Sequence, residues 1–220
     1  MADLFGAPPV ADNGHRPLAD RLRPRTLSDV IGQDQILGPE GPLKVMLEGG
    51  ALGSLIFWGP PGVGKTTIAR LLADETDLHF VQISAIFSGV PELRKVFDAA
   101  KIRRQNGQGT LLFVDEIHRF NKAQQDGFLP HMEDGTILLV GATTENPSFE
   151  LNRAVLSRAQ VLVLERLDDA DLALLVARAE AELGFTLPLE PAARQALLDM
   201  ADGDGRALLN LIEQIGAWKV

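Results

Sequence analysis

The chain has 220 residues, 45% hydrophobic and 23% charged, so it is long enough to bury the core of one domain with a smaller appendage. No run approaches 18 apolar residues, and the start has no basic segment followed by an apolar one, so we expect neither a membrane span nor a secretory signal. The lack of cysteine excludes a disulfide framework and favours the cytoplasm. Because 21 basic residues face 30 acidic ones, any contact with DNA should be local.

Residues 1–17 are rich in Gly, Pro, Ala and Asp without periodicity, which predicts a flexible tail. Within it, Asp3-Leu4-Phe5 is similar to the end of the short peptides that dock on bacterial sliding clamps, although an ordinary disordered start is the simpler interpretation. Residues 17–33 lead toward the domain. Their apolar or stacking-capable side chains either cover an adenine ring or form a linker that packs on the core; those proposed for adenine are Arg23, Pro24, Val30 and Ile31. A helix is predicted over 43–48.

The stretch 59–66 reads GPPGVGKT and fits the pattern GxxxxGKT, whose glycines let backbone N–H groups turn inward toward phosphates. The apolar run 55–58 predicts a buried strand before this loop, and the spacing over 66–73 predicts a helix after it. Lys65 is expected to reach the outer phosphates, and the Thr66 hydroxyl to ligate Mg²⁺. The predicted nucleotide-binding residues of the loop are Gly59, Pro60, Pro61, Gly62, Val63, Gly64, Lys65, Thr66 and Thr67.

A second strand is predicted over 79–83 and a helix over 92–105, whose basic residues form either a solvated face or a face toward DNA. A third strand, over 110–114, is apolar throughout and ends directly in Asp115 and Glu116. Ligands of open parallel sheets lie beyond the carboxyl ends of the strands, so both acids should face the nucleotide rather than cap the next helix. We expect Asp115 to hold Mg²⁺ and Glu116 to deprotonate the attacking water.

Residues 137–140 predict a fourth strand, after which Thr144 is expected to touch the γ-phosphate and the attacking water. A fifth strand is predicted over 161–164, and three helical patterns follow from residue 168 onward. We therefore predict an α/β domain over 18–167, with a parallel five-stranded sheet of order 5-1-4-3-2, and a small all-helical lid over 168–220 hinged near Leu167. The four histidines, including His118, lack metal-ligand spacing and receive no metal.

The motifs GPPGVGKT, LLFVDEIH, GATTEN, VLSRA and GDGRALLN, in this order, resemble an AAA+ ATPase of the clamp-loader clade. The runs HRFNKAQQDGFLPH and GATTENPSFELN resemble more closely the RarA/MgsA family, the bacterial relatives of the Werner-helicase-interacting protein. The resemblance covers nearly all of 17–220. It implies ATP and Mg²⁺ as cofactors and a P-loop fold.

The resemblance also assigns roles to residues. It makes Lys65 and Thr66 the Walker A pair, Asp115 and Glu116 the Walker B pair, and Thr144 sensor 1. It implies that Arg158 serves a neighbouring subunit as an arginine finger and that Arg206 is sensor 2 in the lid. By pattern alone, an ordinary surface ion pair is the simpler interpretation of each of the two arginines.

The family implies a DNA-stimulated ATPase that maintains replication forks and acts in DNA repair and recombination on DNA ends, gaps or replisome components. Single-strand-binding protein and the sliding clamp are the expected protein partners, and the location is the nucleoid. Family members form tetramers through a further C-terminal region, so we expect that the chain is truncated at Val220. Two alternatives stay open: a Holliday-junction branch-migration motor, and a slowly hydrolysing scaffold like an inert clamp-loader subunit.

Overall fold

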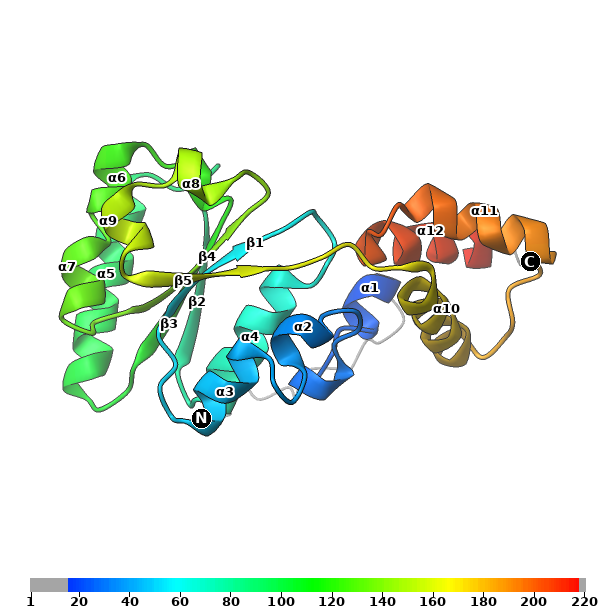
Figure 1. Cartoon of the computed structure of the whole chain (residues 1–220), viewed down its shortest axis with the longest axis horizontal. Coiled ribbons are helices and arrows are strands. Elements are labelled where there is room, and N and C mark those ends of the chain that lie inside the picture. The colour runs from blue at the N-terminus through cyan, green and yellow to red at the C-terminus, as the bar shows by residue number, and fades with distance from the viewer. Residues whose placement is uncertain (1–15, 218–220) are drawn as a thin grey trace, which may run out of the picture.

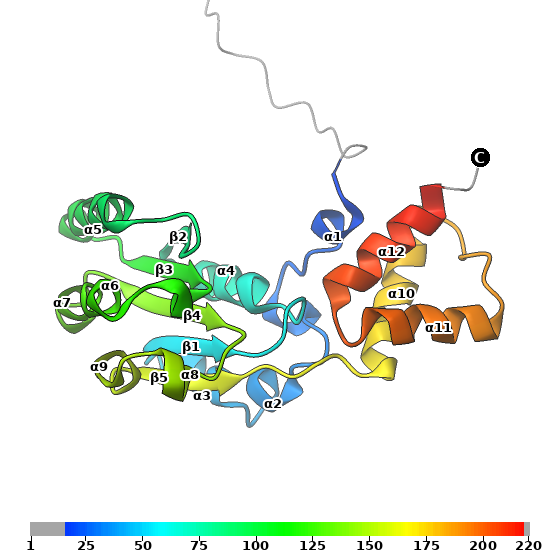
Figure 2. The same cartoon turned by 90° about the horizontal axis from the view of Figure 1, so that it is seen from above.

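The computed structural model describes residues 16–217. The tail expected over 1–17, including Asp3-Leu4-Phe5, therefore lies outside the described residues apart from its last two positions. Five parallel strands form one sheet, in the order β2-β3-β4-β1-β5. These are β1 (Ser54–Trp58), β2 (His79–Ser84), β3 (Thr110–Asp115), β4 (Leu138–Thr143) and β5 (Ala159–Val163). This order confirms the prediction, and Figure 2 shows the strands stacked from β2 to β5.

Helices cover both faces of the sheet (Figures 1 and 2). One group lies before β1 or directly after the phosphate loop: α2 (Asp34–Leu37), α3 (Pro42–Glu48) and α4 (Lys65–Glu75). The opposite group comprises α5 (Val90–Gln105), α6 (Lys122–Asp126), α7 (Leu129–Glu133), α8 (Pro147–Glu150) and α9 (Arg153–Leu156). Two short 3₁₀ helices are η1 (Leu27–Asp29) and η2 (Ile117–Arg119). No helix within 16–217 is long and apolar enough to cross a membrane.

Side chains of successive strand residues point to opposite faces, so the sheet separates two hydrophobic cores. In β3, Leu111 and Phe113 belong to the core shared with α3 and α4, whereas Leu112 and Val114 belong to the core shared with α5 and α7. All four side chains are fully buried. A strand buried on both faces reads as a continuous apolar run, which is why β3 was recognisable in the sequence.

The lid is a separate helical unit with its own core (Figure 1). It contains α10 (Asp169–Leu183), α11 (Pro191–Ala201) and α12 (Gly205–Ala217), and no strand occurs over the described part of 168–220. The short helix α1 (Leu18–Arg21) packs on α12: Leu18 is fully buried in the lid core, and its N–H donates to Glu213 Oε1 at 2.9 Å. The start of the described chain therefore packs with its end.

The fourth strand is longer than predicted, since it continues through Gly141, Ala142 and Thr143. Glycine is a common strand terminator by composition, but Gly141 pairs in register with Ile56 of β1. A Cβ on Gly141 would lie 2.9 Å from both Ile56 Cδ1 and Ile117 Cδ1. The glycine is thus a site of close approach, where η2 docks against β4. The strand therefore does not end at Gly141 but continues to Thr143.

Candidate nucleotide-binding site

A cavity of about 540 Å³ lies between the carboxyl edge of the sheet and the lid, within the size range of small-molecule sites. Three parts of the chain form its walls: the N-terminal segment 17–31, the phosphate loop with the Walker B acids, and the lid helices α10 and α12. Most of the predicted site residues line it, namely Pro61, Gly62, Val63, Gly64, Lys65, Thr66, Thr67, Asp115, Glu116, Arg23, Pro24, Val30, Ile31 and Arg206.

The phosphate loop connects β1 to α4 as the pattern predicts. Gly62 and Gly64 have φ values of 72° and 100°, in the left-handed region that glycine adopts without strain. Gly64 is also the N-cap of α4, so the positive end of that helix faces the cavity. Oriented amides at a helix N-terminus favour an anionic group, which fits a phosphate in this loop.

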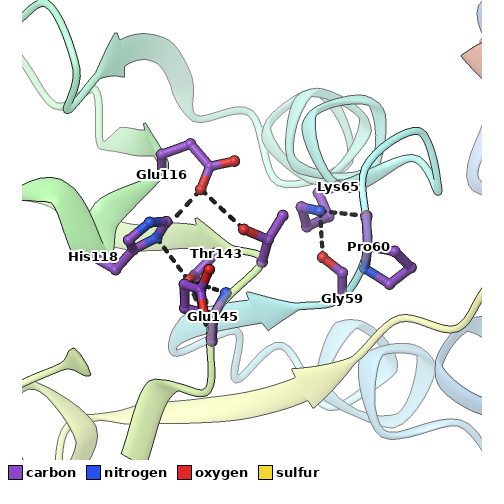
Figure 3. Close-up of polar contacts among 8 residues, drawn as sticks. Gly59, Pro60, Lys65, Glu116, His118, Thr143 and Glu145 are labelled. Atoms are coloured by element: carbon purple, nitrogen blue, oxygen red, sulfur yellow. Dashed lines mark hydrogen bonds and ion pairs between the residues drawn. The ribbon is translucent and has the colours of Figure 1, made fainter. Parts of the chain in front are cut away.

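Lys65 closes the loop on itself. Its Nζ donates to the carbonyl oxygens of Gly59 at 2.7 Å and Pro60 at 2.6 Å, and the residue is 9% exposed (Figure 3). Burial lowers the pKa of Lys65, while the nearby Glu116 and Asp115 oppose that shift. The ammonium group is thus held by two carbonyl oxygens of residues that do not themselves line the cavity. Phosphate oxygens are the ligands that would complement its charge.

Asp115 ends β3, and Glu116 follows it in a left-handed conformation with φ 52° and ψ 47°. A non-glycine residue at positive φ is strained, and such residues gather at functional sites. The turn aims the Glu116 side chain into the cavity, while Thr144 Oγ1 lies 3.5 Å from Glu116 Oε2. Thr144, which comes directly after β4, thus sits behind Glu116 rather than on the cavity wall.

The N-terminal segment is fixed by a residue that sequence reasoning missed. Gln33 is fully buried, and its amide exchanges two hydrogen bonds with the backbone of Glu165: Nε2 donates to O at 3.0 Å, and Oε1 accepts from N at 3.2 Å. Gln33 thereby ties the wall formed by Val30 and Ile31 to the segment that enters the lid. A single glutamine in a turn carries no periodic signal, so no sequence pattern could have found it.

The lid reaches the phosphate loop at the start of α12. Arg206 and Gly205 line the cavity, and a Cβ on Gly62 would overlap the carboxylate of Asp204. Asp204 Oδ1 accepts from the N–H of Ala207 at 2.8 Å and so caps α12. The position of α12 is therefore coupled directly to the loop that is expected to hold phosphates.

Arg158 lies away from this cavity. Its Nε donates to Glu133 Oε1 at 2.8 Å, and its Nη1 donates to Ala154 O at 2.9 Å and to Ser157 Oγ at 3.1 Å. The side chain is exposed at the end of α9. Within one copy of the chain, the structure does not bring Arg158 together with Lys65 and Glu116.

Comparisons with known proteins identify the family. A family model described as the Holliday junction DNA helicase RuvB P-loop domain matches residues 22–162. The chain belongs to this family. The matched residues end within β5, before the lid begins.

Curated relatives of this RuvB-like chain include Replication-associated recombination protein A of Coxiella burnetii, 48% identical over 211 residues, which cover 94% of this chain and 48% of that protein. The protein of the same name from Escherichia coli is 46% identical, over 93% of this chain and 47% of the relative. The ATPase WRNIP1 of Dictyostelium discoideum is 42% identical, over 90% and 23%. The chain spans about half the length of the bacterial relatives. The predicted resemblance to the RarA family is confirmed.

Among solved structures, the RuvB Holliday junction branch migration motor of Thermotoga maritima superposes with a TM-score of 0.71 at 27% identity, covering 87% of this chain and 64% of that one. The fold and the family together confirm the prediction of an AAA+ P-loop ATPase. A nucleotide is therefore the ligand class of the cavity.

Proposed function

We propose that this chain is the Mg²⁺-dependent ATP-hydrolysing domain of a protein that acts on DNA in replication-associated recombination and repair. The observation that carries the proposal is the cavity in which Lys65, Thr66, Asp115 and Glu116 meet under a lid. Support for the biological role comes from relatives named Replication-associated recombination protein A, which are 46–48% identical to this chain.

In this proposal Lys65 binds the outer phosphates, and the Thr66 hydroxyl and the Asp115 carboxylate hold Mg²⁺. Hydroxyl and carboxylate oxygens are the hard ligands that Mg²⁺ prefers, and both residues line the same cavity. Bound Mg²⁺ would neutralise charge on the phosphates. Glu116 takes the proton from the attacking water, and Thr144 orients Glu116. Arg206 contacts the phosphates from the lid, and Arg23, Pro24, Val30 and Ile31 cover the adenine.

Further proposals concern the DNA substrate, assembly, location and partners of the intact protein. We propose that DNA junctions or ends stimulate the ATPase, that the protein acts as a homotetramer in the cytoplasm at the nucleoid, and that single-strand-binding protein or the sliding clamp is its partner. An ATPase assay of the intact protein with single-stranded, duplex and forked DNA tests the first point. Equal rates with and without every DNA would remove DNA stimulation.

A Holliday-junction motor is the alternative with a specific observation in its favour, namely the match to the RuvB P-loop domain. The higher identity to Replication-associated recombination protein A, 46% against 27%, favours the first proposal. Branch migration of a synthetic four-way junction at rates coupled to ATP hydrolysis would favour the alternative. The scaffold alternative predicts ATP binding without appreciable turnover.

Two substitutions in the intact protein test the site itself. Lys65→Ala should abolish nucleotide binding, because it removes a phosphate ligand. Glu116→Gln should retain ATP affinity and lose about 10²- to 10⁴-fold in kcat, because it removes only the base. The measurements are titration with a fluorescent ATP analogue and steady-state phosphate release. An equal loss of ATP affinity in both variants would contradict the role of Glu116.

A further inference from the structure

We infer that His118 is a positioning residue for Glu116: a proton on its Nδ1 holds one carboxylate oxygen of the base and fixes the direction of the other. This inference rests on the proposed function, in which Glu116 deprotonates water. It gives a role to a histidine for which neither the sequence pattern nor the metal-ligand spacing suggested one.

The geometry is a three-residue chain (Figure 3). His118 Nδ1 lies 3.2 Å from Glu116 Oε2 and 2.9 Å from Thr143 Oγ1. The imidazole is 7% exposed, and Thr143 is fully buried at the end of β4. A buried imidazole between two oxygen atoms is held in one orientation, because leaving either polar group unpaired there is costly.

The hydrogen-bond inventory decides which atom carries the proton. Thr143 Oγ1 accepts from the N–H of Glu145 at 3.0 Å and can donate its own hydrogen to Glu145 O at 3.2 Å. The hydroxyl thus has a donor and an acceptor in Glu145 already and is free to accept from His118. An ionised Glu116 can only accept. Nδ1 can therefore form favourable contacts with both oxygen atoms only when it carries the hydrogen. It then donates that hydrogen to Thr143 Oγ1 and Glu116 Oε2 together.

Both side-chain contacts to Glu116 use the same oxygen. His118 Nδ1 and Thr144 Oγ1 lie beside Oε2, and within residues 16–217 no hydrogen bond is made to Oε1. Oε1 is therefore the oxygen left to accept a proton from water in the cavity. His118 itself is not part of the cavity wall, so it acts on the reaction through Glu116 rather than by touching the nucleotide.

The packing of η2 on β4 supports this arrangement. Ile117, the residue between Glu116 and His118, is fully buried and occupies the space above Gly141. This contact docks η2 on β4 and brings His118 over Thr143. The left-handed turn at Glu116 then directs the glutamate side chain back toward the imidazole. The imidazole ring of His118 thus connects Glu116, which follows β3, with Thr143 at the end of β4.

The test uses two substitutions at His118 in the intact protein. His118→Leu keeps a similar bulk and removes the donor, and kcat should fall about 10- to 100-fold, the size of effect that misplacement of a catalytic group by about 1 Å produces. ATP affinity should stay within about twofold, because His118 does not line the cavity. His118→Asn places an amide N–H near the position of Nδ1 and should recover most of the lost kcat.

A double variant separates positioning from a general structural role. If His118 acts through Glu116, adding His118→Leu to Glu116→Gln should lower the residual rate by less than about twofold, since the base is already absent. His131→Leu is the matched control: His131 lies on α7 outside the cavity, and its Nδ1 is buried without a hydrogen-bond partner. Its kcat should equal that of the parent.

The outcomes are distinct. Parental kcat in His118→Leu, failure of His118→Asn to recover activity, or a full further loss in the Glu116→Gln background would each overturn the inference. Parental turnover in Glu116→Gln would overturn the proposed role of Glu116 and the inference with it. Should His118→Leu not fold, Thr143→Val removes the acceptor that orients the ring. There, a severalfold fall in kcat at unchanged ATP affinity supports the inference, and parental kcat contradicts it.

Discussion

Gly62 is the residue at which the phosphate loop meets the lid. Its backbone is left-handed, with φ 72°, and the carboxylate of Asp204 occupies the space that a side chain would fill. Two separate requirements therefore exclude other residue types at this position: the conformation and the lid contact. The same contact places the negative charge of Asp204 next to the loop expected to bind phosphates, and Asp204 also raises the pKa of Lys65 against the lowering caused by burial.

We predict that Gly62→Ala lowers the free energy of unfolding by about 2–3 kcal/mol. About 1–2 kcal/mol comes from the left-handed conformation and about 1 kcal/mol from displacing Asp204 from its cap on α12. Gly50→Ala is the matched control, since Gly50 has φ 62° and no atom near its missing Cβ; it should cost only the conformational part. Urea unfolding measures both, and equal losses in the two variants would show that the lid contact contributes nothing.

At the scale of elements, the cavity depends on ties between segments far apart in the chain. Gln33 connects the segment before α2 to the segment after β5, across 132 positions. Its amide offers one donor and one acceptor to the Glu165 backbone, much as a neighbouring strand would. This pair of hydrogen bonds therefore helps to hold the wall of Val30 and Ile31 in place.

Gln33→Glu replaces the donor with a buried carboxylate that faces the carbonyl of Glu165. We predict a loss of about 3 kcal/mol in unfolding free energy and a lower melting temperature by about 10 °C. Nucleotide affinity should fall as well, because the adenine wall loosens. Gln105→Glu, the same change at an exposed position near the end of α5, is the control and should leave both quantities near parental values. Thermal unfolding and titration with an ATP analogue measure them.

The lid has its own clasp between helices. Glu180 of α10 accepts from Arg194 Nη2 at 2.6 Å and from the N–H of Leu187 at 2.9 Å. Burial raises the pKa of Glu180, but these two hydrogen bonds and the charge of Arg194 outweigh it and hold the pKa below its ordinary value of 4.5. The clasp thus contributes stability that is complete above the ordinary pKa and is lost as the pH falls through the lower, folded-state pKa.

Glu180→Gln should therefore be less stable than the parent at pH 7 and approach it in acid. Chemical unfolding at a series of pH values between about 3 and 7 measures the difference. The gap between the two proteins should narrow as the pH falls below 4.5. A gap that is constant over this range would mean that the charge of Glu180 makes no contribution to the clasp.

At the scale of the whole molecule, Arg158 is a predicted site residue that lies apart from the cavity in one copy of the chain. Glu133 holds its guanidinium on the surface beside α9. If Arg158 acts as an arginine finger, as we propose, it needs the nucleotide of another molecule, which the proposed homo-oligomer would supply. An arginine finger contributes about 10³- to 10⁵-fold in rate, so most of the activity should depend on assembly.

We predict that the specific ATPase activity of the intact protein rises with protein concentration and that Arg158→Ala removes this rise while ATP affinity is nearly unchanged. Mixing adds a second signature: Arg158→Ala subunits combined with Glu116→Gln subunits should recover part of the activity, because an intact arginine of one can serve an intact glutamate of the other. Arg153→Ala, an exposed arginine five positions earlier at the start of α9, is the control. A mixture that co-assembles and stays inactive would refute action between subunits.

The sequence by itself determined the sheet, the phosphate loop and the Walker B acids, because each is encoded by neighbouring residues. A run such as 110–114 is apolar because both of its faces are buried, and the glycines of 59–64 allow the backbone turns that a phosphate cradle needs. Such short-range patterns survive in the order of residues and can be read without coordinates.

Only the tertiary structure decided which distant residues complete the site. Three contacts join residues that are 25 to 142 positions apart: the hydrogen bonds of Gln33 to Glu165, the close approach of Asp204 to Gly62, and the contact of His118 with Thr143. None of these pairs follows a periodic pattern or a motif spacing in the sequence. The structure also assigned α1 to the core of the lid, far from its neighbours in sequence. These contacts depend on where whole elements pack, and hydrophobic burial specifies that packing without marking the polar residues that come to meet there.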